Sequence, residues 1–181
     1  MKPRAVFLDR DGVLNRAVVR AGRPYPPASV DDLEILPGAA AALARLKAAG
    51  YALVVVTNQP DIARGTTTRA AVDAIHARLA ALLPIDEFRV CPHDDSDACA
   101  CRKPRPGLLV DPPTNDVAAS VMVGDRWRDI EAGRAAGCGA TILIDYQYDE
   151  PMRHEPDVRV ASLSEAAAWI LTRPRRDDLI P

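Results

Sequence analysis

The stretch AVFLDRDG, from Ala5 to Gly12, decides the fold, and the stretch YALVVVTN, from Tyr51 to Asn58, repeats its pattern. Each begins as an apolar run and turns polar at its end. A run that is hydrophobic on both faces is typical of a strand buried in a parallel sheet. VMVGD, from Val121 to Asp125, shows the same pattern a third time. These three stretches therefore predict parallel strands that share one core.

Helical patterns lie between the predicted strands. Helical spacing of apolar residues, or start and stop signals, mark the segments Pro37–Ala49, Thr66–Leu83, Arg126–Ala136 and Ser164–Leu171. Two further strands are predicted at Phe88–Val90 and Thr141–Ile144. Because strands and helices alternate along the chain, the predicted class is α/β, a doubly wound parallel sheet with helices on both faces.

Two proline-containing segments are predicted to hold little regular structure. Arg16–Pro27 is polar and proline-rich and is interpreted as a loop. In the segment Gly107–Ser120, the pair Pro112-Pro113 limits any helix to about one turn. The stretches between Asp11 and Thr57 and between Asn58 and Cys91 are filled by the predicted elements. We therefore expect no cap domain and an open site.

Length and composition limit the class of protein. The chain has 181 residues, of which 48% are hydrophobic and 27% are charged, as expected for one globular domain. We expect this domain to span residues 1–172 and residues 173–181 to form a flexible tail. A net charge of -2 argues against nucleic-acid binding through bulk charge, and no apolar run is long enough for a membrane span. The charged N-terminus differs from a signal peptide, so we expect a cytoplasmic monomer or small homo-oligomer with neither nucleic acid nor membrane as partner.

Acidic and hydroxyl side chains follow three predicted strands, at the sheet edge where parallel sheets bind their ligands. Asp9 and Asp11 follow the first strand, Thr57 the second and Asp125 the third. Helix caps are the alternative interpretation, but Asp9 and Asp11 precede a long loop. Carboxylates at one edge repel one another unless a cation lies between them, and their hard oxygens suit Mg²⁺. In such a site one aspartate can act as nucleophile and another as general acid and base.

Three cysteines and a histidine lie close together in the sequence: Cys91, His93, Cys99 and Cys101. Three thiolates and an imidazole form a complete ligand set for a structural zinc site. The alternative, that these cysteines are core residues, conflicts with the polar run DDSD at positions 94–97. The sequence therefore predicts a zinc-binding loop over residues 91–101.

The same residues carry a resemblance to a known family. DRDGVLN, from Asp9 to Asn15, resembles the first motif of the haloacid dehalogenase superfamily of phosphohydrolases. Thr57-Asn58, Lys103 and Gly124-Asp125-x-x-x-Asp129 resemble its second, third and fourth motifs. The segments VVVTNQPDIARG and CRKPRPG resemble, more narrowly, the D-glycero-D-manno-heptose 1,7-bisphosphate 7-phosphatases, which are related to the histidinol-phosphatases. The resemblance extends from about Ala5 to Ile144 and implies the α/β fold of that superfamily.

The resemblance implies a role for each motif residue. Asp9 is the expected nucleophile, Asp11 the expected general acid and base, and Asp9, Asp11 and Asp125 the expected ligands of Mg²⁺, Asp11 through its backbone carbonyl. The zinc loop is a known feature of the same phosphatases. The remaining roles fall to Thr57 and Asn58 at the transferring phosphoryl group, Lys103 as its counter-charge, Asp129 as a support of the metal site, and Gln59, Arg64, Arg102 and Arg126 as candidate substrate contacts.

Two features depart from the family pattern. The usual T-N-Q-S-G is Thr57-Asn58-Gln59-Pro60-Asp61 here, which adds a stiff residue and a negative charge near the expected phosphate. The connection Gly107–Ser120 is shorter than the helix that relatives carry there. Both departures affect the prediction of the substrate more than the prediction of the reaction.

The leading hypothesis is a Mg²⁺-dependent phosphatase that hydrolyses a phosphorylated sugar through an aspartyl-phosphate. The 7-phosphate of D-glycero-D-manno-heptose 1,7-bisphosphate is the first candidate, and histidinol-phosphate or another small phosphomonoester is the alternative substrate. A zinc-bound interaction module without catalysis and an enzyme that processes nucleic-acid ends are alternatives of other classes. Arg20, Arg23 and Tyr25 are predicted to face the distal part of the substrate, and His76 is predicted to lie at the surface.

Overall fold

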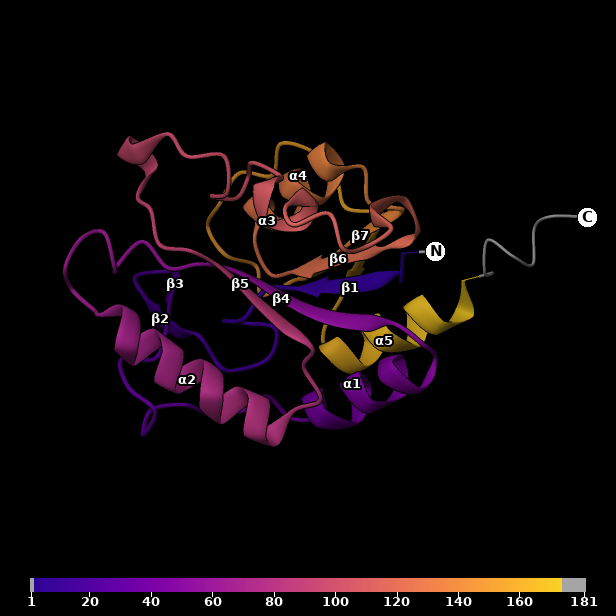
Figure 1. Cartoon of the computed structure of the whole chain (residues 1–181), viewed down its shortest axis with the longest axis horizontal. Helices are drawn as coiled ribbons and strands as arrows, with labels where there is room; N and C mark the ends of the chain where they lie inside the picture. The colour runs from indigo at the N-terminus through magenta and orange to yellow at the C-terminus, as the bar shows by residue number, and fades with distance from the viewer. Residues whose placement is uncertain (1, 174–181) are drawn as a thin grey trace, which may run out of the picture.

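A computed structural model describes residues 2–173 of the chain (Figure 1). Within these residues, six parallel strands form one sheet in the order β5-β4-β1-β6-β7-β8. The strands are β1 Ala5–Leu8, β4 Ala52–Asn58, β5 Glu87–Cys91, β6 Val121–Gly124, β7 Ala140–Ile144 and β8 Val158–Val160. This sheet confirms the predicted α/β class.

Helices cover both faces of the sheet (Figure 1). One face packs against α1 Ala39–Ala48, α2 Arg69–Leu82 and α5 Leu163–Thr172, and the other packs against α3 Gly107–Val110 and α4 Trp127–Ala136. Both faces of the sheet must be covered by helices, because alternate side chains of a strand such as β1 point to opposite faces. Val6 and Leu8 join the larger hydrophobic cluster, whereas Ala5 and Phe7 join the smaller one. The predicted apolar runs are therefore strands buried on both faces.

Most predicted elements are confirmed to within three residues at either end, and two strand regions were missed. The segment 16–27 holds a hairpin of β2 Val18–Arg20 and β3 Arg23–Tyr25 rather than a loop. Its turn residues Ala21 and Gly22 both have positive φ, as in the tight turns that suit hairpins. Strand β8 was also missed, because two half-buried residues on either side of an exposed one make a weak pattern. Apart from Arg173, the predicted C-terminal tail lies outside the described residues.

The strand register brings the polar strand ends together. Leu8 pairs with Val55 of β4 and with Val123 of β6, and the backbone N–H of Asp9 donates to the carbonyl of Val123 at 2.9 Å. The residues that follow these three strands therefore share one edge of the sheet. Short helical turns at 95–97 and 117–119 complete the fold. No helix among residues 2–173 has the length and apolarity needed to cross a bilayer.

Candidate active site

Three carboxylates meet at the sheet edge. Asp9 follows β1, Asp125 follows β6, and Asp129 lies in the first turn of α4. One oxygen from each lies within 4.8 Å of the others. The loop after β1 can approach this closely because position 12 is a glycine: a Cβ on Gly12 would lie 2.1 Å from Asp125 Oδ2, and its φ is +86°. The glycine is thus required by the packing of the cluster.

Lys103 places a positive charge among these carboxylates. Its Nζ donates to Asp129 Oδ1 at 2.6 Å, to Asp9 Oδ1 at 2.8 Å and to the backbone carbonyl of Val56 at 2.8 Å. Burial alone would lower the pKa of Lys103, but the carboxylates of Asp129 and Asp9 outweigh that effect and raise its pKa above the ordinary value. The side chain is therefore an ammonium ion held by all three of its N–H donors.

The cluster carries more negative charge than Lys103 can balance. Burial raises the pKa of Asp9 to about 6 against the lowering influence of Lys103. Burial, together with the nearby charges of Asp9 and Asp129, raises the pKa of Asp125 well above its usual range. Both carboxylate oxygens of Asp125 are buried and make no hydrogen bond of acceptable geometry among residues 2–173, although the hydroxyl of Tyr148 is near enough to lower the pKa of Asp125 in part. Such orphaned oxygens are what a bound cation would satisfy.

The carboxylate of Asp11 lies outside this cluster and has its own set of donors. Arg10 donates to it twice, from Nε to Oδ1 at 3.1 Å and from Nη2 to Oδ2 at 2.9 Å. Asn15 Nδ2 donates to Oδ1 at 2.9 Å and Gln59 Nε2 to Oδ2 at 3.2 Å. The expectation that the side chains of Asp9, Asp11 and Asp125 gather is therefore correct for Asp9 and Asp125 and wrong for Asp11, because other side chains hold its carboxylate. The third carboxylate of the cluster is that of Asp129.

The end of β4 connects the cluster to the segment that carries Lys103. The amide of Asn58 and the backbone of Lys103 exchange two hydrogen bonds, each 3.0 Å long. Thr57 is buried and its Oγ1 accepts a hydrogen bond from Gln59 Nε2 at 2.9 Å. Gln59, predicted to contact the substrate, is itself buried and contacts Thr57 and Asp11. The side chains of this strand end thus orient other site residues.

A cleft of about 320 Å³ opens beside the cluster. Three arginines that were predicted to contact the substrate line it, and each is paired with a carboxylate. Arg64 donates to Asp94 at 2.6 and 2.8 Å, Arg102 Nε to Asp95 at 2.8 Å, and Arg126 Nε to Glu150 at 3.1 Å. The cleft is lined by Asp9, Asp11, Pro24, Tyr25, Pro26, Thr57, Asn58, Pro60, Asp61, Arg64, Asp95, Arg102, Lys103, Arg126, Arg128 and Asp129.

Sequence reasoning missed part of the cleft wall. Arg128 lines the cleft and donates to Asp95 Oδ1 at 3.2 Å. Its position between Asp125 and Asp129 of the fourth motif could have indicated that it lies near the site. Tyr25 lines the cleft, as predicted, and the guanidinium of Arg20 lies 5.8 Å from its ring. The side chain of Arg23 lies outside the described part of the structure. The hairpin thus contributes one wall through β3.

The prediction that His76 lies at the surface is wrong. His76 is only 6% exposed, and its ring stacks on Phe88 with centroids 4.5 Å apart. Its Nε2 lies 3.2 Å from Nη1 of Arg10, and the Arg10 side chain is fully buried. Periodicity placed His76 on the polar face of its helix, but the neighbouring strand β5 and the loop after β1 cover that face. Arg10 was not singled out from the sequence either.

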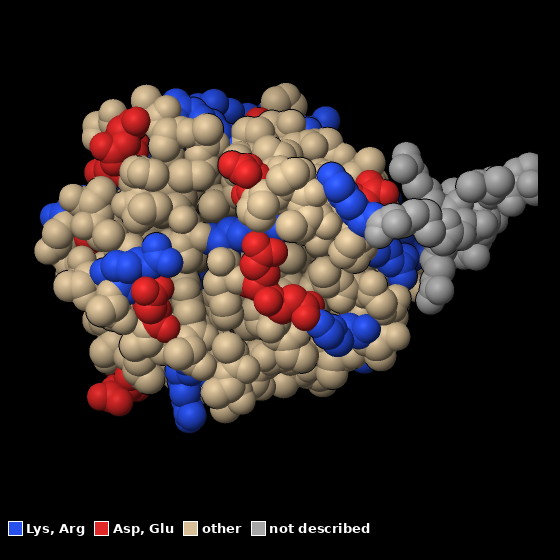
Figure 2. All heavy atoms as spheres, viewed as in Figure 1, with Lys and Arg blue, Asp and Glu red and all other residues tan. Residues whose placement is uncertain are grey.

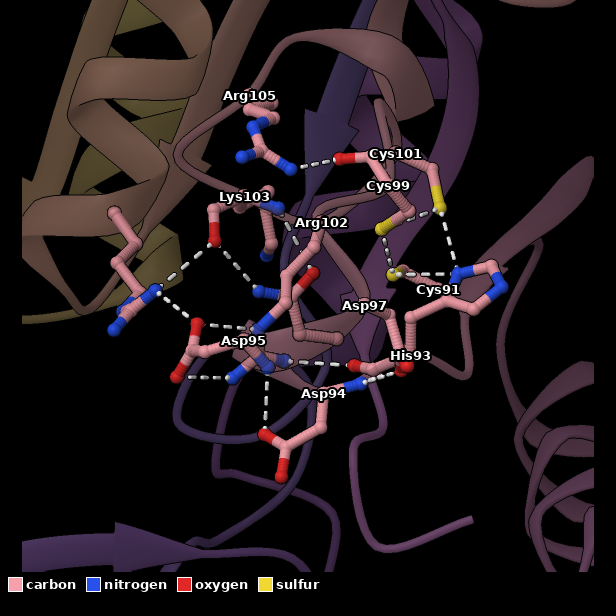
Figure 3. Close-up of polar contacts among 12 residues, drawn as sticks. Cys91, His93, Asp94, Asp95, Asp97, Cys99, Cys101, Arg102, Lys103 and Arg105 are labelled. Atoms are coloured by element: carbon pink, nitrogen blue, oxygen red, sulfur yellow. Dashed lines mark hydrogen bonds and ion pairs between the residues drawn. The ribbon is translucent and has the colours of Figure 1, made fainter. Parts of the chain in front are cut away.

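The four predicted zinc ligands converge (Figure 3). The Sγ atoms of Cys91 and Cys99 are 3.6 Å apart and those of Cys99 and Cys101 are 3.5 Å apart. His93 Nδ1 lies 3.6 Å from Cys91 Sγ and 3.3 Å from Cys101 Sγ. These separations exclude disulfides, whose sulfur atoms lie about 2.05 Å apart. Arg102 and Lys103 follow directly, so the cluster is one or two residues from the cleft.

Basic side chains do not form a continuous stripe on the face that Figure 2 shows. Lys and Arg side chains lie there in small groups between Asp and Glu side chains. Nucleic-acid binding through the phosphate backbone needs a concentrated basic surface. The view therefore gives no support to the hypothesis of nucleic-acid end processing.

Comparisons with known proteins agree with this geometry. Residues 14–137 match the family model of haloacid dehalogenase-like hydrolases. A D-glycero-alpha-D-manno-heptose-1,7-bisphosphate 7-phosphatase of Mycobacterium tuberculosis (strain ATCC 25618 / H37Rv) is 42% identical over 77% of this chain and 78% of its own length. The D-glycero-beta-D-manno-heptose-1,7-bisphosphate 7-phosphatase of Escherichia coli (strain K12) is 36% identical over 92% of this chain and 87% of its own length. A crystal structure of D,D-heptose 1,7-bisphosphate phosphatase from B. bronchiseptica, complexed with magnesium and phosphate, superimposes with a TM-score of 0.76 at 34% identity, covering 93% of this chain and 98% of that one.

Proposed function

The chain belongs to the haloacid dehalogenase-like hydrolase family, and from this premise we propose that it is a phosphatase that removes the 7-phosphate of D-glycero-D-manno-heptose 1,7-bisphosphate. Relatives that bear the name of this activity are 42% and 36% identical to it over the aligned residues. The observation that carries the proposal is the buried cluster of Asp9, Asp125 and Asp129 around Lys103, beside an open cleft. The names of the two relatives specify different anomers, so the anomer is a question for experiment.

The reaction uses Asp9 and Asp11 in two steps. Asp9 attacks the phosphorus atom, the bond between phosphorus and the C7 oxygen breaks, and protonated Asp11 gives its proton to that oxygen. An aspartyl-phosphate on Asp9 results. Water then attacks the same phosphorus and gives a proton to Asp11, and inorganic phosphate leaves Asp9. Lys103 holds Asp9 at 2.8 Å and offers positive charge to the phosphoryl oxygens.

The residues of the cluster fit Mg²⁺. We assign the ion to the carboxylates of Asp9 and Asp125 and to the backbone carbonyl of Asp11, because the oxygens of Asp125 are buried and lack donors in the described part of the chain. Asp129 is the supporting residue, since its oxygens accept from Lys103 and from the backbone N–H of Arg126. When bound, Mg²⁺ neutralises and orients the transferring phosphoryl group. The magnesium and phosphate in the B. bronchiseptica relative support this assignment.

The cysteine and histidine cluster fits a structural zinc ion. Four ligands around zinc at about 2.3 Å for sulfur form a tetrahedron whose sulfur atoms lie about 3.8 Å apart. The measured separations between Cys91, Cys99 and Cys101 are 3.5 and 3.6 Å, close to this value. With His93 as the fourth ligand the set is closed, so the proposed role of the metal is to order the loop.

The arginines of the cleft favour a substrate with a second phosphate. Lys103 and the metal suffice for one phosphoryl group, and Arg64, Arg102 and Arg126 add three guanidinium groups along the same cleft. Guanidinium groups bind phosphate with two parallel hydrogen bonds. A bisphosphate could replace a carboxylate partner, such as Asp95 on Arg102, at its distal end. This supports the bisphosphate over histidinol-phosphate.

The test is a panel of phosphorylated metabolites with Mg²⁺, measured by phosphate release. We expect the highest kcat/KM for one anomer of heptose 1,7-bisphosphate and a lower value for histidinol-phosphate. Asp9→Asn should abolish turnover and leave the circular dichroism spectrum unchanged, because the amide cannot form an acyl phosphate. Asp31→Asn, which alters an exposed aspartate, is the control. Equal or better turnover of histidinol-phosphate would overturn the substrate, and turnover by Asp9→Asn would overturn the mechanism.

A further inference from the structure

Arg10 is a fully buried charged residue that the proposed chemistry does not use. Its relative exposure is 0%, and it is among the largest of the fully buried side chains. A buried guanidinium is strongly unfavourable unless its donors and its charge are satisfied. Each of its three nitrogen atoms has a partner: two face Asp11 and the third faces His76. The position of these partners shows what the residue can do.

Toward the cleft, Arg10 holds both oxygens of Asp11. The distances are 3.1 and 2.9 Å, so the planar guanidinium and the carboxylate form a two-point contact that restricts rotation of the carboxylate. Asn15 and Gln59 add one donor to each oxygen. The Asp11 side chain stays 15% exposed and lines the cleft. The carboxylate is thus fixed by four donors while it faces the place where the substrate would bind.

Away from the cleft, Arg10 is held by His76 of α2. An arginine nitrogen can only donate, so the Nε2 atom of His76, at 3.2 Å, is the acceptor and the ring is neutral. Burial, reinforced by the charge of Arg10, lowers the pKa of His76 to about 4, so the ring stays neutral at physiological pH. Its stacking on Phe88 ties this acceptor to the hydrophobic core. The guanidinium therefore lies between a fixed acceptor and the Asp11 carboxylate.

We propose that Arg10, anchored by His76, is a positioning residue that fixes the Asp11 carboxylate for proton transfer to and from the reacting oxygen atoms. The inference rests on the proposed function, in which Asp11 is the general acid and base. Arg10 also balances part of the charge of Asp11, although this carboxylate still contributes to the raised pKa of Asp9. Without Arg10 the carboxylate would keep one donor on each oxygen, from Asn15 and Gln59, and would be held less firmly toward the leaving oxygen.

The test compares two leaving groups. p-Nitrophenolate is a good leaving group that needs little protonation, whereas an alkoxide needs a general acid, which contributes about 10²–10⁴-fold. The probes are p-nitrophenyl phosphate and the alkyl phosphate that the wild type hydrolyses fastest. In Arg10→Met we expect kcat/KM to fall at least about 100-fold for the alkyl phosphate and less than about 10-fold for p-nitrophenyl phosphate. Equal losses for both would overturn the inference, because a merely structural role affects both substrates alike.

Controls separate this inference from folding and from the proposed function. Arg89 is also buried and is paired with Glu87 at 2.8 Å on β5, so Arg89→Met should change both substrates by one common factor. If Arg10→Met does not fold, His76→Leu removes the acceptor and keeps Arg10; a selective loss of at least about threefold supports the inference and an equal loss contradicts it. Asp11→Asn tests the proposed function itself. Absence of leaving-group selectivity there would reject Asp11 as the acid, whereas selectivity in Asp11→Asn without selectivity in Arg10→Met rejects the positioning role alone.

Discussion

Lys103 shows how much one residue of this site depends on its surroundings. Its ammonium contacts Asp9, Asp129 and a backbone carbonyl, and its side chain is 3% exposed. Lys47 and Asp86 form an ion pair as well, but their side chains are 44% and 36% exposed. Exposed pairs contribute about 0–1 kcal/mol, whereas breaking a buried pair costs about 3–5 kcal/mol. The buried lysine is thus a site residue whose removal should also destabilise the fold.

His76 makes the stability of the protein depend on pH. Burial and the charge of Arg10 lower its pKa from 6.5 to about 4. In the unfolded chain His76 is therefore protonated below about pH 6.5, whereas in the folded protein it is protonated only below about pH 4. The free energy of unfolding is lost as the pH falls through this range. The expected loss is up to about 3 kcal/mol. In His76→Gln, the free energy of unfolding, measured in urea at pH 4 to 7, should fall by correspondingly less.

A second histidine provides the comparison for this measurement. His154 is exposed and pairs with Glu131 at the surface, where such pairs contribute little to stability, so His154→Gln is the matched surface substitution. Both variants retain the carboxylates of the cluster, whose titration is then common to all three proteins. Equal pH dependence in wild type and His76→Gln would show that His76 is accessible to protons in the folded protein.

At the scale of residues, the sequence predicted those side chains whose position follows from strand ends. Asp9, Thr57 and Asp125 come directly after apolar runs, and parallel pairing brings such positions together. The contact between Arg10 and His76 could not be predicted in this way, because nothing in the sequence indicates that their two polar side chains face each other. Their burial follows from contacts between β5, α2 and the loop after β1, which are set by the whole fold.

Among the elements, the loop from Cys91 to Cys101 needs a source of order other than hydrophobic burial. It contains a run of polar residues and few apolar ones, so hydrophobic burial cannot offset the entropy lost on ordering. Its carboxylates nevertheless fix arginines of the cleft: Asp94 accepts from Arg64, and Asp95 accepts from Arg102. The proposed zinc ion would therefore organise the cleft wall without contacting the substrate.

Removal of the proposed zinc should weaken catalysis and stability together. In Cys99→Ser one of four ligands is lost, and we expect lower zinc content, a lower Tm, and a fall in kcat/KM of about 10- to 100-fold because Arg102 and Lys103 lose their fixed position. Zinc is measured by elemental analysis, and loop order by amide hydrogen exchange. Cys138→Ser, which changes a half-buried cysteine outside the cluster, should retain zinc. Chelation that strips zinc but leaves turnover and Tm unchanged would contradict the proposal.

Elements with a strong local pattern were predicted and elements without one were not. The apolar runs of β1, β4, β6 and β7 could be recognised because strands buried on both faces are nearly continuous in hydrophobicity. The β2–β3 hairpin has exposed residues, includes Pro24, and turns at Ala21-Gly22 rather than at an Asn-Gly pair. Its strand character comes from pairing across the turn, which composition does not reveal.

For the whole molecule, the fold gathers three carboxylates from two separate segments, the end of β1 and the connection from β6 to α4, at one buried place. Asp9, Asp125 and Asp129 face one ammonium, that of Lys103. The two oxygens of Asp125 make no hydrogen bond of acceptable geometry within residues 2–173. Burial and the charges of Asp9 and Asp129 raise the pKa of Asp125, and the nearby Tyr148 hydroxyl offsets only part of this. The folded protein without metal is therefore less stable than its packing would allow, and a bound cation relieves the repulsion.

This predicts opposite effects of one substitution with and without magnesium. In EDTA at pH 7, Asp125→Asn should raise the free energy of unfolding by about 1–3 kcal/mol, because it replaces a buried carboxyl group that is unfavourable beside Asp9 and Asp129 with a neutral amide that can donate to those carboxylates. With Mg²⁺ at 100 times its dissociation constant, the wild type should gain about 2.7 kcal/mol, and the variant should gain little. Urea unfolding with and without the ion measures both quantities.

A carboxylate that has hydrogen-bond donors provides the contrasting case. Oδ2 of Asp157 accepts hydrogen bonds from the backbone N–H and the hydroxyl of Thr141 at 2.7 and 2.9 Å. Asp157→Asn should therefore destabilise the protein in EDTA and keep the full response to Mg²⁺. If Asp125→Asn instead destabilised the metal-free protein, the buried carboxylate would have a partner that balances it, and the argument for a cation between Asp9 and Asp125 would lose its basis. If the variant kept the wild-type response to Mg²⁺, the ion would bind elsewhere on the molecule.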